Sequence, residues 1–235
     1  MLRTYNAVLE NVSQLTPRVK EFRFKIDQHL DFKTGQWLML EIPGQEETIK
    51  RAMSIASPAY EKDTVDFCVK KIEGGKGSTA MHLMQPGEKI SFTGPFGRFI
   101  LNYPTNADIV MIATGSGISP FKAMALELLE NKKVPNQIYL LFGNRTEDEI
   151  IYRTFFEELA NTYPNFHFIP TLSRPHETWQ GEVGRVQELI KKYISPENKN
   201  REFYLCGLKD MILTTLELLE KSGFYKQNIH FERYN

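Results

Sequence analysis

Two patterns of apolar residues predict a two-domain fold, β then α/β, in which an antiparallel β-barrel is followed by a parallel sheet with helices on both faces. Up to about residue 100, short segments alternate apolar and polar side chains and are broken by turn residues. From about residue 106, apolar runs of strand length alternate with amphipathic helical stretches. The pattern changes at 101–105, so we expect one domain over residues 1–100 and a second over residues 101–235.

The barrel is predicted from strands whose side chains change face at every residue. The alternating segments are 22–26, 37–42 and 65–70, and in the last of these Val65, Phe67 and Val69 are opposite to Asp66, Cys68 and Lys70. Turn pairs separate the segments, at Thr34-Gly35, Pro43-Gly44, Gly74-Gly75 and Pro86-Gly87. Half-buried strands with such breaks are typical of a compact antiparallel barrel. One helix is expected to interrupt it, at Ser78–Met84.

The second half of the chain predicts a β-α-β series. Its strand candidates are Asp108–Ala113, Gln137–Phe142, Phe166–Thr171, Arg201–Cys206 and Ile229–Tyr234. The helices between them are expected over Pro120–Asn131, Asp148–Tyr163, Arg185–Tyr193 and Leu208–Ser222. This alternation is typical of a Rossmann-like parallel sheet, in which right-handed crossovers place the ligand crevice at the carboxyl ends of the strands.

Composition narrows the classes of partner. The 235 residues include 29 basic and 29 acidic ones, so no net charge attracts the chain to nucleic acid or to an anionic membrane. No signal-peptide core or apolar run of about 18 residues is present, so we expect a cytoplasmic protein, with a monomer favoured. Cys68 and Cys206 are too few for a plant-type iron-sulfur cluster, and the five histidines form no ligand pair. We expect no metal, and any iron-sulfur chemistry on another chain.

An arginine, a serine and a glycine turn in the first half suggest an anion site. Arg51-Ala52-Met53-Ser54 ends a strand-like segment, and Gly75-Lys76-Gly77-Ser78-Thr79 leads into the expected helix with Ser78 as its N-cap. A fixed cation, a hydroxyl donor and exposed backbone N–H groups suit a pyrophosphate. A solvated arginine beside a plain glycine hairpin is the alternative explanation of the same residues.

A second anion site is indicated where the strand Asp108–Ala113 runs into Thr114-Gly115-Ser116-Gly117, with Pro120 near the first turn of a helix. The segment is not the three-glycine Rossmann fingerprint, because the third glycine is missing and no acidic residue closes the next strand. A tight turn without a ligand is the alternative.

Together with Gly94-Pro95-Phe96-Gly97, Cys206-Gly207 and Glu232-Arg233-Tyr234, these motifs occur in an order and with a spacing that resemble the ferredoxin-NADP reductase family of FAD/NAD(P)H oxidoreductases. Members of that family pass a hydride between a nicotinamide and FAD. The resemblance implies that Arg51 pairs with the FAD pyrophosphate and that Ser54 hydrogen-bonds the flavin N5 atom. It also assigns Val69, Lys70, Gly75, Gly77, Ser78 and Thr79 to the flavin site. Met53 stands where the family usually has a stacked aromatic residue, and its thioether can still cover a ring face.

In the second half, the resemblance implies a nicotinamide dinucleotide site at Thr114, Gly115, Ser116, Gly117 and Pro120. Cys206 and Gly207 would lie near the nicotinamide ring, although a buried cysteine is commonly just a small hydrophobe. Tyr234, positioned by Glu232, would cover the flavin face that the nicotinamide must occupy. The expected catalytic residues are therefore Ser54, Cys206, Glu232 and Tyr234.

Two strand-end arginines bear on the choice of dinucleotide. Ser173-Arg174 and Arg185 suit a ribose 2′-phosphate, whereas NAD-specific sites usually present a carboxylate to the free hydroxyls. NADP is therefore favoured over NAD. The alternative is that both arginines are solvated residues flanking a loop.

The implied function is hydride transfer between NADPH and bound FAD, followed by release of single electrons to a carrier such as ferredoxin or flavodoxin, or to an oxygenase component. Lys50, Lys70, Lys71 and Lys76 are candidates for a basic rim facing an acidic carrier, although charge runs are more often solvated faces. Two alternatives stay open. One is an NAD(P)H-dependent free flavin reductase, which Met53 favours, and the other is a non-catalytic flavin-binding regulatory subunit.

Overall fold

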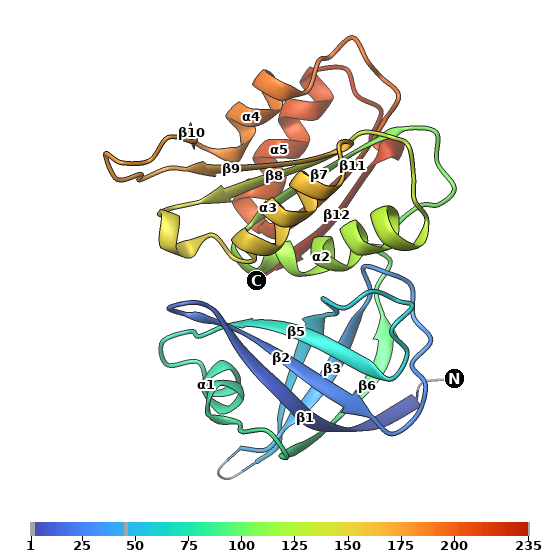
Figure 1. Cartoon of the computed structure of the whole chain (residues 1–235), viewed down its shortest axis with the longest axis vertical. Coiled ribbons are helices and arrows are strands. Elements are labelled where there is room, and N and C mark those ends of the chain that lie inside the picture. The colour runs from blue at the N-terminus through green and yellow to red at the C-terminus, as the bar shows by residue number, and fades with distance from the viewer. Residues whose placement is uncertain (1–2, 45–46, 235) are drawn as a thin grey trace. The chain divides into compact units, whose positions relative to one another are not determined.

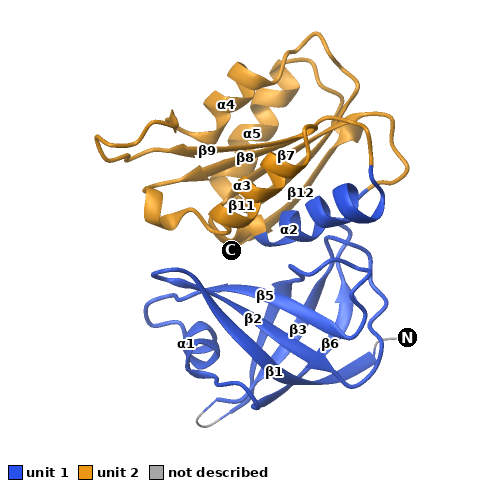
Figure 2. Cartoon of the chain, in the orientation of Figure 1, with its two compact units in different colours: residues 1–101, 119–133 blue, residues 102–118, 134–235 orange. Residues whose placement is uncertain are grey.

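The computed structural model describes residues 3–44 and 47–234, and the chain divides into two compact units (Figure 1). Unit 1 comprises residues 1–101 and 119–133, and unit 2 comprises residues 102–118 and 134–235 (Figure 2). The chain therefore passes from one unit to the other after residues 101, 118 and 133. A division of function at residue 100 stays a prediction.

Unit 1 is built on a six-stranded antiparallel sheet with the strand order β4-β3-β6-β1-β2-β5. Its strands are β1 (Arg3–Thr16), β2 (Val19–Ile26), β3 (Trp37–Ile42), β4 (Ile49–Ser54), β5 (Thr64–Lys70) and β6 (Lys89–Phe96). The edge strands β4 and β5 contact each other, so the sheet curls into the expected antiparallel barrel. Its core contains the fully buried Phe24, Leu38 and Leu40, and Phe22 pairs with Phe67 across β2 and β5.

The prediction for one side chain of β5 is wrong. Alternation places Asp66 on the solvent face with Cys68 and Lys70, but Asp66 is only 1% exposed. Arg23 and Lys122 both form ion pairs with its carboxylate, and these pairs compensate for the burial of the charge.

The helix of the barrel, α1 (Lys76–Leu83), begins at Lys76 rather than at Ser78, and Gly75 is its N-cap. The expected capping role of Ser78 is therefore wrong. Its hydroxyl instead accepts a hydrogen bond from the Ile72 N–H at 3.0 Å and lies 3.2 Å from the Gly75 carbonyl oxygen, closing the turn before the helix. The first turn of α1 is left without a side-chain cap or an acidic residue.

One helix of the predicted β-α-β series packs as part of unit 1. Helix α2 (Ser119–Leu126) continues into the π-helical turn η2 (Glu127–Asn131), and Figure 2 shows α2 in the colour of unit 1. The ring of Phe121 lies edge-on to that of Phe99, with centroids 6.0 Å apart. Met124 lies against Gly35, where a Cβ would come within 2.7 Å of the Met124 methyl carbon.

Unit 2 contains a six-stranded parallel sheet with the strand order β10-β9-β8-β7-β11-β12. Its strands are β7 (Asp108–Thr114), β8 (Ile138–Asn144), β9 (Phe166–Leu172), β10 (Glu182–Val183), β11 (Arg201–Leu208) and β12 (Ile229–Tyr234). The chain builds β8, β9 and β10 on one side of β7, and then β11 and β12 on the other. The strand order therefore reverses between β7 and β11, the position where open parallel sheets bind their ligands.

Helices cover both faces of this sheet, as predicted. Helices α4 (Val186–Tyr193) and α5 (Lys209–Lys221) share one apolar cluster with sheet residues, and Ile169 packs against that cluster. Helix α3 (Arg153–Thr162) packs through Phe156, whose ring centroid lies 5.2 Å from that of Phe168. Since Phe168 and Ile169 are neighbours on β9, they point to opposite faces. Short 3₁₀ turns complete the unit at η1 (Gly115–Ile118), η3 (Glu147–Glu149) and η4 (Lys226–Asn228).

The expected continuous helix over Asp148–Tyr163 is wrong at its start. The turn η3 ends at Glu149, Tyr152 has a left-handed φ of 58°, and α3 begins only at Arg153. Ile150, Ile151 and Tyr152 are all buried. Three consecutive side chains of a helix point in directions about 100° apart, so a regular helix at a sheet surface would not bury all three.

Candidate functional site

In unit 1, the structure brings Arg51 and the glycine turn before α1 together. Arg51 lies on the edge strand β4, and a Cβ on Gly77 would come within 2.9 Å of both Cγ and Nε of the arginine. Gly77 is buried under that side chain. One guanidinium nitrogen of Arg51 donates to the Lys50 carbonyl at 2.7 Å. The arginine is therefore held along the first turn of α1, with its charge beside the start of the helix.

This arrangement fits a diphosphate. The first turn of a helix leaves backbone N–H groups without intrahelical partners, and in α1 no acidic residue or side-chain cap competes for them. The positive end of the helix dipole and the Arg51 guanidinium act in the same direction on an anion. Of the other expected contacts in this turn, Gly75 is the N-cap, and Thr79 donates its N–H to the Gly75 carbonyl at 3.0 Å.

Met53 and Ser54 end β4 in different surroundings. Ser54 pairs with Trp37 of β3 and is 8% exposed. Met53 is half-buried and packs against the barrel core. Since successive residues of a strand face opposite sides, Met53 shares the face of Arg51, and Ser54 lies on the other face.

Val69 and Lys70 end β5 next to α1. The Val69 carbonyl accepts a hydrogen bond from Nε2 of His82 at 2.9 Å, which joins the strand to the helix. Burial lowers the pKa of His82, although the bond to Val69 opposes this shift. The imidazole is therefore neutral at pH 7, with its proton on Nε2. Val69 is buried, and Lys70 is half-buried.

In unit 2, the expected dinucleotide residues meet where the strand order reverses. A Cβ on Gly117 would lie 2.3 Å from the Cys206 carbonyl oxygen, and one on Gly207 would lie 2.4 Å from Oγ1 of Thr114. The ends of β7 and β11 are thus packed backbone against backbone, which only glycine allows here. Ser116 is half-buried in the same turn, and Pro120 is the second residue of α2, in unit 1.

Two observations show that this turn fits a phosphate group. Oγ1 of Thr114 is buried and has no hydrogen-bond partner within residues 3–44 and 47–234. A buried hydroxyl without a partner is costly, and a ligand oxygen would satisfy it. Gly115 has a φ of 54°, and a Cβ placed on it would meet nothing within 4 Å. The turn therefore exposes its backbone to open space beside the Thr114 hydroxyl.

The two last strands of unit 2 bring Cys206, Glu232 and Tyr234 together. In the parallel pairing of β11 with β12, Cys206 is opposite Glu232, and Leu208 is opposite Tyr234. Burial and then the Glu232 carboxylate raise the pKa of the Cys206 thiol well above its usual value, and a hydrogen bond with Tyr234 opposes them. The thiol is therefore protonated at neutral pH and is not a nucleophile.

The segments that carry the strand-end arginines lie at the carboxyl ends of the parallel strands. The N–H groups of Ser173 and Arg174 donate to the Asn144 and Arg145 carbonyls, at 3.0 and 2.8 Å. The segment before Arg185 is tied to the same edge, because the Gly184 N–H donates to the end of β9 at 2.9 Å. Sequence analysis missed Arg145. It directly follows β8, as Arg174 closely follows β9, and this recurrence of an arginine after a strand could have identified it.

The three arginine side chains at this edge are exposed, and in the part of the chain that the structure describes none of them forms an ion pair. Free guanidinium groups at the carboxyl ends of parallel strands can recognise a phosphate monoester. Over the same described residues, no three His, Cys, Asp or Glu side chains gather where they could hold a metal ion. No described helix has both the length and the apolar character to cross a membrane.

Comparison with family models and known proteins gives a consistent result. Residues 6–101 match an oxidoreductase FAD-binding domain, and residues 111–216 match an oxidoreductase NAD-binding domain. The chain is 33% identical to ferredoxin–NADP reductase B of Sorangium cellulosum over 241 residues, which cover 98% of each chain. It is also 33% identical to the phenol hydroxylase P5 protein of Acinetobacter pittii, over 100% of this chain but 66% of that protein, just under two thirds of its length.

A solved structure matches over the full chain as well. A ferredoxin NADP+ reductase from Neisseria gonorrhoeae, with bound FAD and NADP, has a TM-score of 0.84 and 25% identity to this chain. The match covers 99% of this chain and 98% of that one.

Proposed function

Because the chain belongs to the ferredoxin-NADP reductase-like family of FAD- and NAD(P)-binding oxidoreductases, we propose that it transfers a hydride between NADPH and bound FAD, and then passes single electrons to a carrier such as ferredoxin or flavodoxin. The observation that carries the proposal is a pair of anion sites, one in each unit. Arg51 lies along the first turn of α1, and the partnerless Thr114 hydroxyl lies beside an open glycine turn. Each of the two dinucleotides brings one diphosphate.

Residues of unit 1 hold FAD in this proposal. Arg51 pairs with the pyrophosphate, and within the segment from Gly75 to Thr79 the first helical residues, Lys76 to Ser78, supply backbone N–H donors to it. Val69 and Lys70 contact the cofactor from the end of β5. The Ser54 hydroxyl donates a hydrogen bond to flavin N5, and the thioether of Met53 lies on the ring.

Residues of unit 2 and the start of α2 hold NADPH. The diphosphate is bound by Thr114, by the turn from Gly115 to Gly117 and by the helix start at Pro120. Ser173, Arg174 and Arg185, joined by Arg145, bind the 2′-phosphate, which supports NADP over NAD.

When bound, FAD and NADPH supply the hydride chemistry themselves. The contribution of the chain is to orient them and to exclude water. Cys206, next to Gly207 at the end of β11, places a neutral thiol beside the nicotinamide. Tyr234 hydrogen-bonds that thiol and moves aside when the nicotinamide enters, and Glu232 positions the tyrosine ring.

Anaerobic titration with NADPH, followed by visible absorbance, tests the proposal. We expect a bound flavin band that bleaches near stoichiometric NADPH. A colourless preparation that reduces added flavin would indicate a free flavin reductase. A yellow preparation that neither NADPH nor NADH bleaches would indicate a non-catalytic flavin-binding subunit. Bleaching by NADH alone would contradict the assignment of the arginines to a 2′-phosphate.

A second candidate acceptor is an oxygenase component, since one relative with 33% identity is a phenol hydroxylase protein. Reduction rates with a ferredoxin, a flavodoxin and the iron-sulfur component of an oxygenase would rank the three. An acidic carrier would meet Lys70, Lys71 and Lys76, whereas Lys50 is paired with Glu41 at 2.9 Å. We expect carrier reduction to slow as ionic strength rises, and a flat response would contradict the basic rim.

A further inference from the structure

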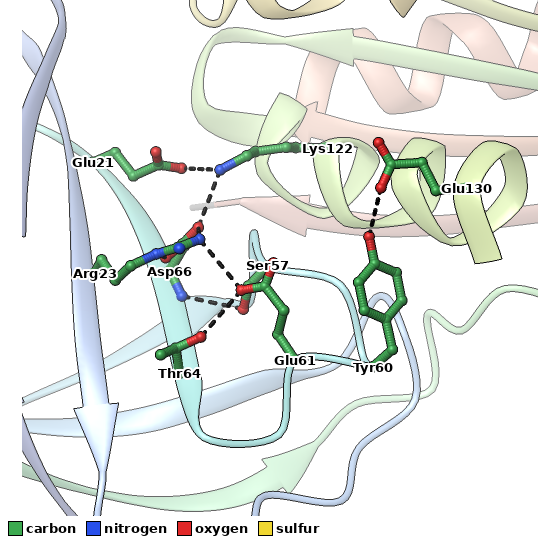
Figure 3. A network of polar contacts seen from close by, with 9 residues as sticks. All are labelled: Glu21, Arg23, Ser57, Tyr60, Glu61, Thr64, Asp66, Lys122 and Glu130. Carbon is green, nitrogen blue, oxygen red and sulfur yellow. Dashed lines mark hydrogen bonds and ion pairs between the residues drawn. The ribbon is translucent and has the colours of Figure 1, made fainter. Parts of the chain in front are cut away.

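A buried cluster of charges joins helix α2 to the barrel within unit 1 (Figure 3). Nζ of Lys122 lies 2.5 Å from Oε1 of Glu21 and 3.1 Å from Oδ2 of Asp66. Arg23 holds the same aspartate with two parallel bonds, Nε to Oδ1 at 2.7 Å and Nη2 to Oδ2 at 2.8 Å. The Asp66 N–H also donates to the Ser57 hydroxyl at 3.2 Å. The aspartate is thus fixed on the barrel before it meets Lys122.

Each charge of this cluster is stabilised by neighbouring charges of opposite sign. The side chains of Lys122 and Asp66 are only 10% and 1% exposed. Burial works to raise the pKa of Asp66, but the Arg23 bond and the Lys122 charge outweigh it and lower this pKa. Burial works to lower the pKa of Lys122, but Glu21 and Asp66 outweigh it and raise this pKa. Both groups therefore stay charged at neutral pH.

A buried cluster of charges contributes little net stability to a fold. Taking the ions out of water costs several kcal/mol per ion, and a well-packed apolar residue is often as stabilising as a buried ion pair. Charge-assisted hydrogen bonds have a preferred direction, which apolar contacts lack. The cluster therefore determines where α2 lies on the barrel more than how strongly it is held there. A second polar contact between this segment and the barrel, from the Tyr60 hydroxyl to Glu130 at 2.8 Å, is exposed and less constraining.

The position of α2 matters because of what precedes it. Lys122 is the fourth residue of α2, and the turn Gly115–Ile118 leads directly into this helix. The turn belongs to unit 2, whereas α2 belongs to unit 1. The turn and α2 are consecutive in the chain, so the first residue of α2 directly follows the turn assigned to the nicotinamide dinucleotide.

We propose that Lys122 is a positioning residue for hydride transfer: its ion pairs with Glu21 and Asp66 fix α2 on the barrel that carries the flavin motifs, and so fix the dinucleotide turn that enters α2. This inference rests on the proposed function. Hydride transfer depends on the placement of donor and acceptor within a fraction of an ångström, and a 1 Å misplacement from a remote change can cost about a hundredfold in rate.

Lys122→Met tests the inference, since methionine keeps much of the length of the side chain and removes the charge. Lys132→Met is the matched control. It removes a lysine of the same segment that pairs with Glu127 at 3.5 Å, and Lys132 is not one of the residues drawn in Figure 3. The measurement is the rate constant for flavin bleaching at saturating NADPH in an anaerobic stopped-flow experiment, with flavin content and thermal unfolding of each variant recorded.

In Lys122→Met we expect retained flavin and a fall of about tenfold or more in the bleaching rate constant, with a smaller change in KM for NADPH. Lys132→Met should stay within about twofold of the unmodified protein, because the Lys132 side chain is 36% exposed and its distance to Glu127 is long, at 3.5 Å. A purely structural role predicts a lower unfolding temperature with an unchanged rate constant in the folded, flavin-loaded protein. That result would overturn the inference.

Glu21→Gln covers the case in which Lys122→Met does not fold. The Glu21 side chain is 17% exposed, and after the change the buried Lys122 keeps its ion pair with Asp66 at 3.1 Å. We expect a rate constant below that of the unmodified protein, and an unchanged value would also overturn the inference. Failure of the proposed function would be seen separately, because no nicotinamide would then bleach the unmodified protein.

Discussion

The close approach of Gly77 and Arg51 predicts that Gly77→Ala separates stability from cofactor binding. The added Cβ would lie 2.9 Å from Cγ and Nε of Arg51, where ordinary contacts begin near 3.4 Å. The arginine must therefore shift by about half an ångström or more. An arginine side chain can move this far without disturbing the barrel, so the change alters the position of the guanidinium and leaves the fold intact.

The two effects have opposite signs. Alanine is better than glycine by about 0.8–1.0 kcal/mol in a helix interior, and this value is an upper bound for Gly77 in the first turn of α1, so the flavin-free protein should be as stable as the unmodified one or slightly more stable. A bond to a charged group contributes about 1.5–3 kcal/mol, and its loss would weaken FAD binding. At about 1.4 kcal/mol for each factor of ten, this corresponds to roughly a 10- to 100-fold increase in Kd.

Quenching of FAD fluorescence on titration into flavin-free protein gives the Kd, and thermal unfolding of the same preparation gives the stability without a contribution from ligand. Arg51→Ala is the control background, since Gly77→Ala should cause no further loss of affinity once the arginine is absent. The reasoning would be refuted if Gly77→Ala raised the Kd for FAD as much in the Arg51→Ala background as in the unmodified protein. An unchanged Kd in Gly77→Ala alone would also refute it.

Three further predictions concern other parts of the molecule. Met53→Tyr should retain FAD and lower its Kd, since a stacked ring adds about 0.5–1.5 kcal/mol; loss of FAD in the titration would contradict the placement of Met53. Arg174→Ala should raise KM for NADPH far more than KM for NADH in steady-state assays, and equal increases would remove the 2′-phosphate assignment. The pKa of Asp66 is lowered from 3.8, so its ionisation favours folding above that pH and this contribution is lost as the pH falls below it. Asp66→Asn should therefore be less stable at pH 7 in urea unfolding, with a shallower loss of stability on acidification, and a slope equal to that of the unmodified protein would contradict the shift.

Much of the fold could be predicted because its signals are local. The strand Trp37–Ile42 and the strand that begins at Phe166 have the expected positions, and apolar periodicity alone identifies them. Strand β1 is harder to identify, since burial alternates only over residues 4–10 and register shifts after Leu9 and Gln14 interrupt the rest of its 14 residues. Two-residue β10 has no detectable period at all.

What escaped prediction depends on contacts between distant residues. Asp66 looks like a solvent-facing residue of an alternating strand until Lys122, 56 residues away, is placed beside it. Arg145 can be grouped with Arg174 only when the ends of β8 and β9 are known to be adjacent. The family resemblance assigns Arg51 and Gly77 to the same flavin site but does not predict their direct contact, and the rejection of Ser78 as a cap required the backbone geometry.

The chain passes between the two units three times, and this limits how the protein could be divided or recombined. A fragment that ends at residue 101 would remove α2 and with it the Lys122 ammonium beside Asp66. The barrel would then expose the surface around Phe99 and keep Asp66 with Arg23 as its remaining cation. Exchange of the flavin module between homologues would therefore require two separate segments of sequence, and a genetic crossover at one junction would deliver an incomplete part.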